Sequence, residues 1–246
     1  MTSDGAMAQA ILLAFLRLVA FFVSAPFPGP IVPPTVRVMF AAGLAWSLTP
    51  ESVAPPSGDL WIAALAELAL GLSAGFLLSL PLSTFTAAGE LVGSQMGLSA
   101  PGLSDPYRFH STIIGSVYTT VALAVFAAGD GPSRVAVFLG RSLELLPPGS
   151  ATVLIPDASW VIGAGAQLMT AAVQVAAPVV TAVFAAQIVL AVLARSVPTL
   201  NLFVEGPALT LSAGVLGFVA SVHTFVPLVD RIFGARFEEL ASWLVS

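Results

Sequence analysis

The sequence predicts an all-α, multi-pass membrane protein with broken, proline-interrupted helices, and three observations lead to this prediction. Hydrophobic residues make up 57% of the 246-residue chain and charged residues only 9%, whereas an ordinary soluble domain carries about 25% charged residues. The mean hydropathy is +0.98. The apolar residues also gather in long stretches. Because so few charges cannot cover a surface in water, the surroundings must be lipid or other membrane helices.

The same composition excludes several kinds of site. Without cysteine the chain has no disulfide, no thiolate metal site and no cysteine nucleophile. The basic residues are all arginine and form no stripe that would bind nucleic acid. The two histidines, His110 and His223, lie far apart in the sequence without a zinc-protease motif. We therefore expect no metal, no cofactor and no nucleic-acid partner.

The predicted helices follow the apolar stretches in order. Residues 1–9 carry no positive charge, so we interpret the first stretch as a retained helix and not as a cleaved signal peptide. The third stretch runs past Pro81 toward Leu98, and a short helix is expected over 135–146 between two Pro-Gly breaks. The six apolar stretches are 6–24, 36–48, 60–80, 112–128, 160–194 and 203–229.

The tail, residues 230–246, has a different pattern. Phe233, Phe237, Leu240 and Leu244 recur at helical spacing, with charged residues between them. This pattern predicts an amphipathic helix. Such a helix would bind lipid headgroups or a partner protein. Alternatively, it would be a solvated end of the chain with one face packed on the rest of the protein.

Two helix lengths do not match a membrane. A crossing needs about 20 residues for a hydrocarbon core of roughly 30 Å, but 36–48 reaches only about 20 Å as a helix. The stretch 160–194 is too long for one crossing and contains Pro178. Proline removes a backbone hydrogen bond, and at membrane depth neighbouring protein must satisfy the freed groups. We therefore expect this chain to be packed among other subunits.

Charged residues inside the apolar stretches are the first candidate functional residues, because a charge in lipid costs several kcal/mol. Three interpretations remain open: a proton relay in a secondary transporter, structural ion pairs, or groups that face a water-filled conduit. The residues are Arg17, Glu67, Glu90, Arg195 and Glu205.

Small residues recur four apart at Gly71 and Gly75 and at Gly93 and Gly97, a spacing that lets helices approach closely, within the chain or between subunits. Gly71, Ser73 and Gly75 also fit the nucleophile-elbow pattern, and an intramembrane protease using Ser73 and His223 is one alternative. That elbow needs a strand–turn–helix setting. Since Ser73 lies in a predicted helix, we expect a protein that is not an enzyme.

The stretch 90–110 is the most unusual part of the sequence. Its glycines, prolines and serines end the helix at about Leu98, yet the segment is too apolar for an ordinary exposed loop. This composition favours a re-entrant element or a plug. The candidate plug residues are Ser99, Ala100, Pro101, Gly102, Leu103, Ser104, Asp105 and Pro106.

Several motifs, in order over about residues 12–230, resemble the FliR family of type III export proteins. The early motifs are Phe15-Leu16-Arg17, Ala25-Pro26-Phe27 and Pro33-Pro34-Thr35-Val36-Arg37. The central signature is Gly89-Glu90, Gly93, Gln95-Met96-Gly97 and then Asp105-Pro106. The later motifs are Leu145-Leu146-Pro147-Pro148-Gly149 and the run 194–204, which includes Arg195, Pro198, Asn201 and Phe203.

The resemblance implies a core subunit of the export gate that helps to form a pore for unfolded proteins. It implies a P-like front half over about 6–157, a Q-like helical hairpin over about 158–229 and the tail 230–246. The implied partners are P and Q components (FliP-like and FliQ-like), a FlhB-like switch component and a FlhA-like subunit. The plug of the family would fall at about 99–111.

The implied location is the bacterial inner membrane, in the flagellar basal body. A flagellar system is preferred here to an injectisome, and a stand-alone proton-coupled transporter is the other alternative. Two positions depart from the family pattern: Glu205 replaces an apolar residue before Gly206-Pro207, and Thr199 stands where glutamine is common.

Overall fold

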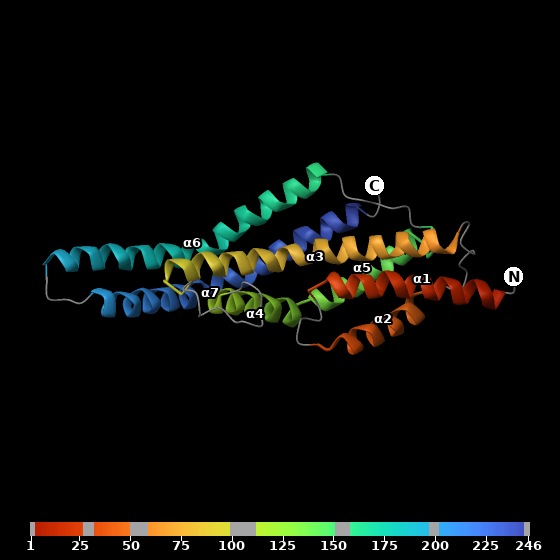
Figure 1. Cartoon of the computed structure of the whole chain (residues 1–246), viewed down its shortest axis with the longest axis horizontal. Helices are drawn as coiled ribbons and strands as arrows, with labels where there is room; N and C mark the ends of the chain where they lie inside the picture. Colours follow the sequence, from red (N-terminus) through yellow and green to blue (C-terminus); the bar gives the residue numbers. More distant parts are fainter. Residues whose placement is uncertain are drawn as a thin grey trace. The chain divides into compact units, whose positions relative to one another are not determined.

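The computed structural model describes residues 3–26, 32–49, 59–98, 112–150, 158–196 and 202–243. These residues form seven α-helices and no strand (Figure 1). The helices are α1 (Ser3–Ser24), α2 (Pro34–Leu48), α3 (Leu60–Gln95), α4 (Ile113–Ala128), α5 (Gly131–Leu145), α6 (Ala158–Ser196) and α7 (Leu202–Trp243). The predicted all-α class is confirmed.

Four helices in the described ranges are long and apolar enough to cross a membrane: α1, α3, α6 and α7. The bent pair α4 and α5 would make a fifth span. Helix α2 has 15 residues, about 22 Å at 1.5 Å per residue, and is too short to cross. The chain is therefore a multi-pass membrane protein, as its composition predicts.

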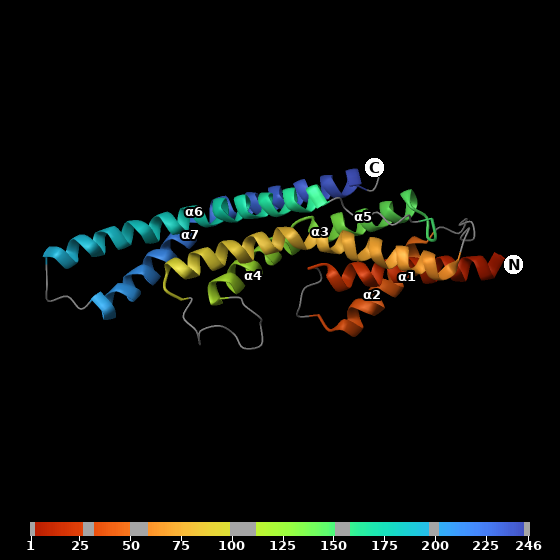
Figure 2. The same ribbon diagram turned by 45° about the horizontal axis from the view of Figure 1, so that its top comes forward.

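Helices α3 and α6 contain an internal proline, as predicted, and helix α5 begins earlier than predicted. Helix α3 continues through Pro81, and α6 continues through Pro178. Figures 1 and 2 show both helices as unbroken ribbons. Helix α5 begins at Gly131, four residues before the predicted start, since Pro132 is acceptable in a first turn, where its missing N–H would have no partner. Packing thus overrides the local tendency of proline to end a helix.

The tail does not form a separate helix, because α7 runs without a break from Leu202 to Trp243. Phe233 and Leu240 are only 2% and 1% exposed. The rings of Phe233 and Phe126 lie 4.4 Å apart. The amphipathic face is therefore packed against the chain's own α4 end, which matches the prediction of a helix with one packed face.

The chain divides into two compact units. The first unit comprises Met1–Leu80, Phe126–Ile162 and Ile232–Ser246. Its core contains buried side chains from α1, α3 and α5, among them Leu13, Leu18, Phe21, Leu70, Leu77 and Leu143.

A glycine crossing joins α1 and α3 in the first unit. A Cβ added at Gly71 would meet the carbonyl oxygen of Arg17, and one added at Gly75 would meet that of Phe21. Ser73 donates its hydroxyl to the Ala69 carbonyl of its own helix at 2.7 Å. The two glycines thus serve helix packing within the chain, and the Ser73 pattern has none of the strand–turn–helix setting that a nucleophile elbow needs.

The second unit comprises Pro81–Val125 and Gly163–Arg231. Aromatic rings fill its centre: Tyr118 of α4 lies 4.9 Å from Phe218 and 5.7 Å from Phe225 of α7. Phe85 of α3 lies 5.2 Å from Phe225. These contacts hold the second part of α3, α4 and α7 in fixed positions, which matters for the segment between α3 and α4.

Candidate functional site

The predicted plug, 99–111, lies outside the described residues, but the chain on either side of it is described. Helix α3 ends before it in a Schellman motif, the left-handed helix end that glycine favours. Leu98 donates its N–H to the Gly93 carbonyl at 2.9 Å, and Gly97 donates to Ser94 at 3.2 Å. Gly97 has φ of 77°, a conformation that other residues rarely adopt. Gly93 and Gly97 therefore define where the helix stops.

Two further helices fix this end of α3. Met96 is 4% exposed, and its Cε lies 2.5 Å from the position of a Cβ added at Gly214 of α7. Gln187 of α6 donates its side-chain amide to the Gln95 carbonyl at 3.1 Å. The side chain of Gln95 itself is exposed. Met96 therefore contributes by packing and Gln95 through its main chain.

The chain returns at Thr112, the N-cap residue of α4. Its hydroxyl oxygen accepts the N–H of Gly115 at 3.0 Å, as an N-cap threonine does. Its own N–H donates to a Glu90 carboxylate oxygen of α3 at 2.6 Å. A carboxylate at a helix N-terminus also interacts favourably with the helix dipole. Glu90 thus acts as a cap supplied by another helix.

Close backbone contact completes this arrangement. A Cβ added at Gly89 would lie 2.6 Å from the Gly115 Cα, and one added at Gly93 would lie 3.0 Å from the Thr112 hydroxyl oxygen. We call residues 89–98 and 112–115 the loop collar. In the loop collar both flanks of segment 99–111 are attached to the last turns of α3.

A second candidate site lies in the first unit, where Arg17 of α1 and Glu67 of α3 are 1% and 0% exposed. Arg17 Nε donates to Glu67 Oε2 at 2.5 Å, and Nη2 donates to Glu67 Oε1 at 3.0 Å. The pair is therefore bidentate, the strongest geometry for an arginine and a carboxylate.

The remaining N–H groups of Arg17 bind the end of α5. Nη1 donates to the Ser142 carbonyl at 2.7 Å and to its hydroxyl at 3.2 Å, and Nη2 donates to the Leu146 carbonyl at 2.8 Å. Arginine has five N–H donors, so all five are used. A helix C-terminus leaves carbonyls without partners and carries partial negative charge. The buried guanidinium of Arg17 both donates hydrogen bonds to these carbonyls and neutralises the partial negative charge at the end of α5.

Glu67 in turn binds the break after α5. Gly149 donates its N–H to Glu67 Oε1 at 2.8 Å, and Gly149 has φ of 90°. We call Arg17, Glu67, Ser142, Leu146 and Gly149 the arginine clamp. Of the interpretations left open for the charges, a structural ion pair describes Arg17 and Glu67.

The other predicted site residues lie elsewhere. Arg195 is exposed in the last turn of α6, and Glu205 is exposed in the first turn of α7. A positive charge at a helix C-terminus and a negative charge at a helix N-terminus both interact favourably with the helix dipole, so each residue is stabilising where it lies. Phe203 lies in the first turn of α7, whereas Pro198 and Asn201 are outside the described residues.

Three residues of these sites belong to no predicted motif: Thr112, Gly115 and Ser142. A threonine just before an apolar stretch is a helix-start signal, so Thr112 could have been recognised. Ser142 contacts Arg17, far away in the sequence, and no local pattern indicates it. Gly149 lies in the later family motif, but that motif does not identify Glu67 as its partner. Within the ranges that the structure describes, no three His, Cys, Asp or Glu side chains gather as a metal site.

Similarity to known proteins identifies the family of this chain. The model of the family described as bacterial export proteins, family 1, matches residues 8–235. The chain belongs to this family. The match includes both flanks of the loop collar and all five residues of the arginine clamp, and it confirms the resemblance inferred from the motifs.

Relatives of this export protein include flagellar proteins. It is 26% identical over 236 residues to the flagellar biosynthetic protein FliR of Aquifex aeolicus, covering 93% of this chain and 90% of the relative. It is 27% identical over 244 residues to FliR of Bacillus subtilis, covering 96% and 94%. It is also 26% identical to the surface presentation of antigens protein SpaR of Salmonella typhimurium, covering 73% and 68%.

Proposed function

We propose that this chain is a core membrane subunit of a flagellar type III export gate and forms part of the pore for unfolded flagellar proteins. The observation that carries the proposal is the similarity, over more than nine tenths of both chains, to proteins named flagellar biosynthetic protein FliR. Its role is structural and not enzymatic. Its place is the bacterial inner membrane, in the flagellar basal body.

The loop collar supports a plug role for residues 99–111. Both flanks of the segment are fixed on α3, by the Schellman motif at Gly97 and by the capped Thr112. A segment that closes a pore needs fixed ends and a composition that can change conformation. Gly102 and the prolines at 101 and 106 supply that composition.

The second half of the chain supports assembly with other subunits. Only 22% of the most apolar window in each of α6 and α7 is buried within the chain. Large apolar side chains such as Phe184, Val192 and Leu216 are 59%, 62% and 69% exposed. Lipid or neighbouring subunits must cover them. We assign this role to P-like and Q-like (FliP-like and FliQ-like) subunits, with FlhB-like and FlhA-like proteins as further partners.

Genetic deletion tests the proposed function directly. Removing the chain from its host should abolish filaments and extracellular filament protein, and a plasmid copy should restore both. If filaments persist while host-cell-directed secretion is lost, the chain serves an injectisome, the alternative that the SpaR similarity favours. If both forms of secretion persist, the gate assignment is wrong.

A second experiment tests the plug. Residues 99–111 are replaced by a short Gly-Ser linker, and the assembled complex is purified and placed in vesicles. We expect normal assembly and a rise in small-solute leakage. As a control, residues 50–58 are replaced by the same linker, which should leave leakage unchanged. Equal leakage from the two assembled complexes would exclude the plug.

A further inference from the structure

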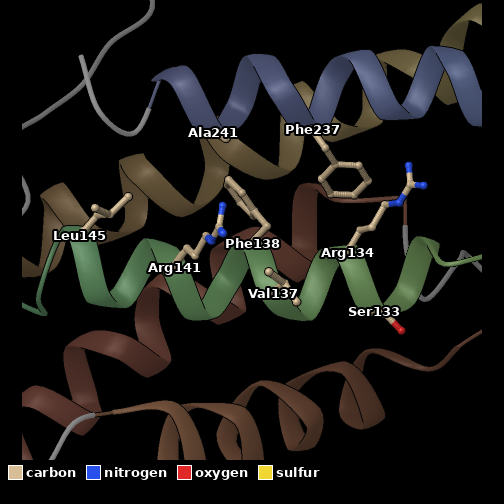
Figure 3. Close-up of a pocket in the computed structure, with 8 residues that line it drawn as sticks. All are labelled: Ser133, Arg134, Val137, Phe138, Arg141, Leu145, Phe237 and Ala241. Carbon is tan, nitrogen blue, oxygen red and sulfur yellow. The ribbon is translucent and has the colours of Figure 1, made fainter.

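A groove on the first unit runs between α5 and the C-terminal part of α7 (Figure 3). Its volume is about 450 Å³. Among its lining residues are Arg134, Val137, Phe138, Arg141 and Leu145 of α5 and Phe237 of α7. We call it the α5–α7 groove. It uses no residue of the loop collar or of the arginine clamp.

The wall of the groove is apolar and open. Val137 and Leu145 are 57% and 51% exposed, whereas Phe138, at 6%, forms part of the buried core. In a membrane protein such exposed side chains contact either hydrocarbon or another protein surface. An apolar groove of this volume between two helices has room for one extended hydrocarbon chain.

The same groove is lined by two arginines, Arg134 and Arg141. Arg141 is exposed and makes no hydrogen bond or ion pair with the part of the chain that the structure describes. Arg134 lies two turns earlier on α5, about 10 Å away along the axis. Figure 3 shows both side chains extending from α5 on the side that faces α7. A guanidinium beside hydrocarbon is unfavourable unless an anion neutralises it.

We propose that the α5–α7 groove binds an anionic phospholipid. The phosphate accepts hydrogen bonds from Arg141, whose planar fork suits a phosphate. One acyl chain lies along Val137, Phe138 and Leu145. An anionic phospholipid would neutralise Arg141 and also cover the apolar wall of the groove. Free phosphate would leave the apolar wall uncovered. Basic pockets between membrane helices are known to bind anionic headgroups.

The test uses the full-length chain in detergent, titrated with phosphatidylglycerol or with phosphatidylcholine and observed by native mass spectrometry. We expect tighter binding of phosphatidylglycerol. Arg141→Gln should weaken its binding about fivefold, the usual contribution of one basic residue near an anionic headgroup. The matched control is Arg231→Gln, because Arg231 is an exposed arginine of α7 outside the groove. It should leave the binding constant unchanged.

Val137→Trp provides a second, independent variant. It fills the groove without changing charge and should weaken binding of phosphatidylglycerol while inorganic phosphate has no effect as a competitor. Three results would overturn the proposal: equal affinity for the two lipids, equal effects of Arg141→Gln and Arg231→Gln, or displacement of the lipid by inorganic phosphate. Folding of each variant is checked by its circular dichroism and its elution volume.

Discussion

Replacing Glu67 by glutamine removes the negative charge of the arginine clamp while keeping the size of the side chain. Arg17, at 1% exposure, would then be a buried cation without a counter-ion. Removing one partner of a buried ion pair costs about 3–5 kcal/mol. We expect Glu67→Gln to lower the free energy of unfolding by that amount.

A double-mutant cycle separates the ion pair from the rest of the clamp. Arg17→Met alone leaves a buried carboxylate whose remaining donor in the clamp is the Gly149 N–H, so it should be about as destabilising as Glu67→Gln. In the double variant no orphan charge remains. Its destabilisation should therefore be smaller than the sum of the two single variants by about 3 kcal/mol.

The assay is reversible unfolding of the purified chain in detergent, followed by circular dichroism. Glu205→Gln is the control, because Glu205 is exposed in the first turn of α7 and exposed charges contribute about 1 kcal/mol or less. If Glu67→Gln changes the unfolding free energy no more than this control does, or if the two single effects simply add, the clamp does not stabilise the fold.

Three further predictions concern glycines and a helix cap, all measured as unfolding free energies. Gly71→Ala should destabilise the fold by about 1–3 kcal/mol through overpacking against the Arg17 carbonyl. The control Gly43→Ala, in open space on α2, should stabilise the fold by about 0.5–1 kcal/mol. Equal effects of the two substitutions would contradict the close crossing of α1 and α3. Gly97→Ala should destabilise by about 1–2 kcal/mol, because φ there is 77°; no loss would mean that the helix end is not left-handed. Thr112→Ala should lose about 1 kcal/mol and Thr112→Ser much less; identical losses would exclude the hydroxyl cap.

Helix positions were largely predictable from the sequence, because the apolar stretches report burial directly. Their ends were less predictable: α5 begins at Gly131, four residues before the expected start, although α3 and α6 continue through Pro81 and Pro178 as expected. A proline disfavours helix locally, but packing on neighbouring helices keeps the helix continuous. The continuity of α7 into the tail has the same origin, since Phe233 and Leu240 are buried only if the helix continues.

The candidate sites were predictable only in part. The sequence identifies Arg17, Glu67 and Glu90 as unusual, because each is a charge in an apolar stretch. It does not identify their partners. Arg17 and Glu67 are 50 positions apart and Glu90 and Thr112 are 22 apart, and helical periodicity gives the face of a residue but not the neighbour that it meets. The plug itself, 99–111, remains a prediction.

The arginine clamp has a consequence for the order of events during synthesis. The ribosome adds about 5–20 residues per second, and the Ser142 carbonyl lies 125 positions after Arg17. The Leu146 carbonyl, the most distant partner, lies 129 positions after Arg17 and is made about 6–26 s later, although Glu67 follows Arg17 after only 50 positions. In the nascent chain, α1 and α3 first form a neutral pair. The end of α5 then binds to that pair, so the arginine clamp can be completed only after α5 and Gly149 have left the ribosome.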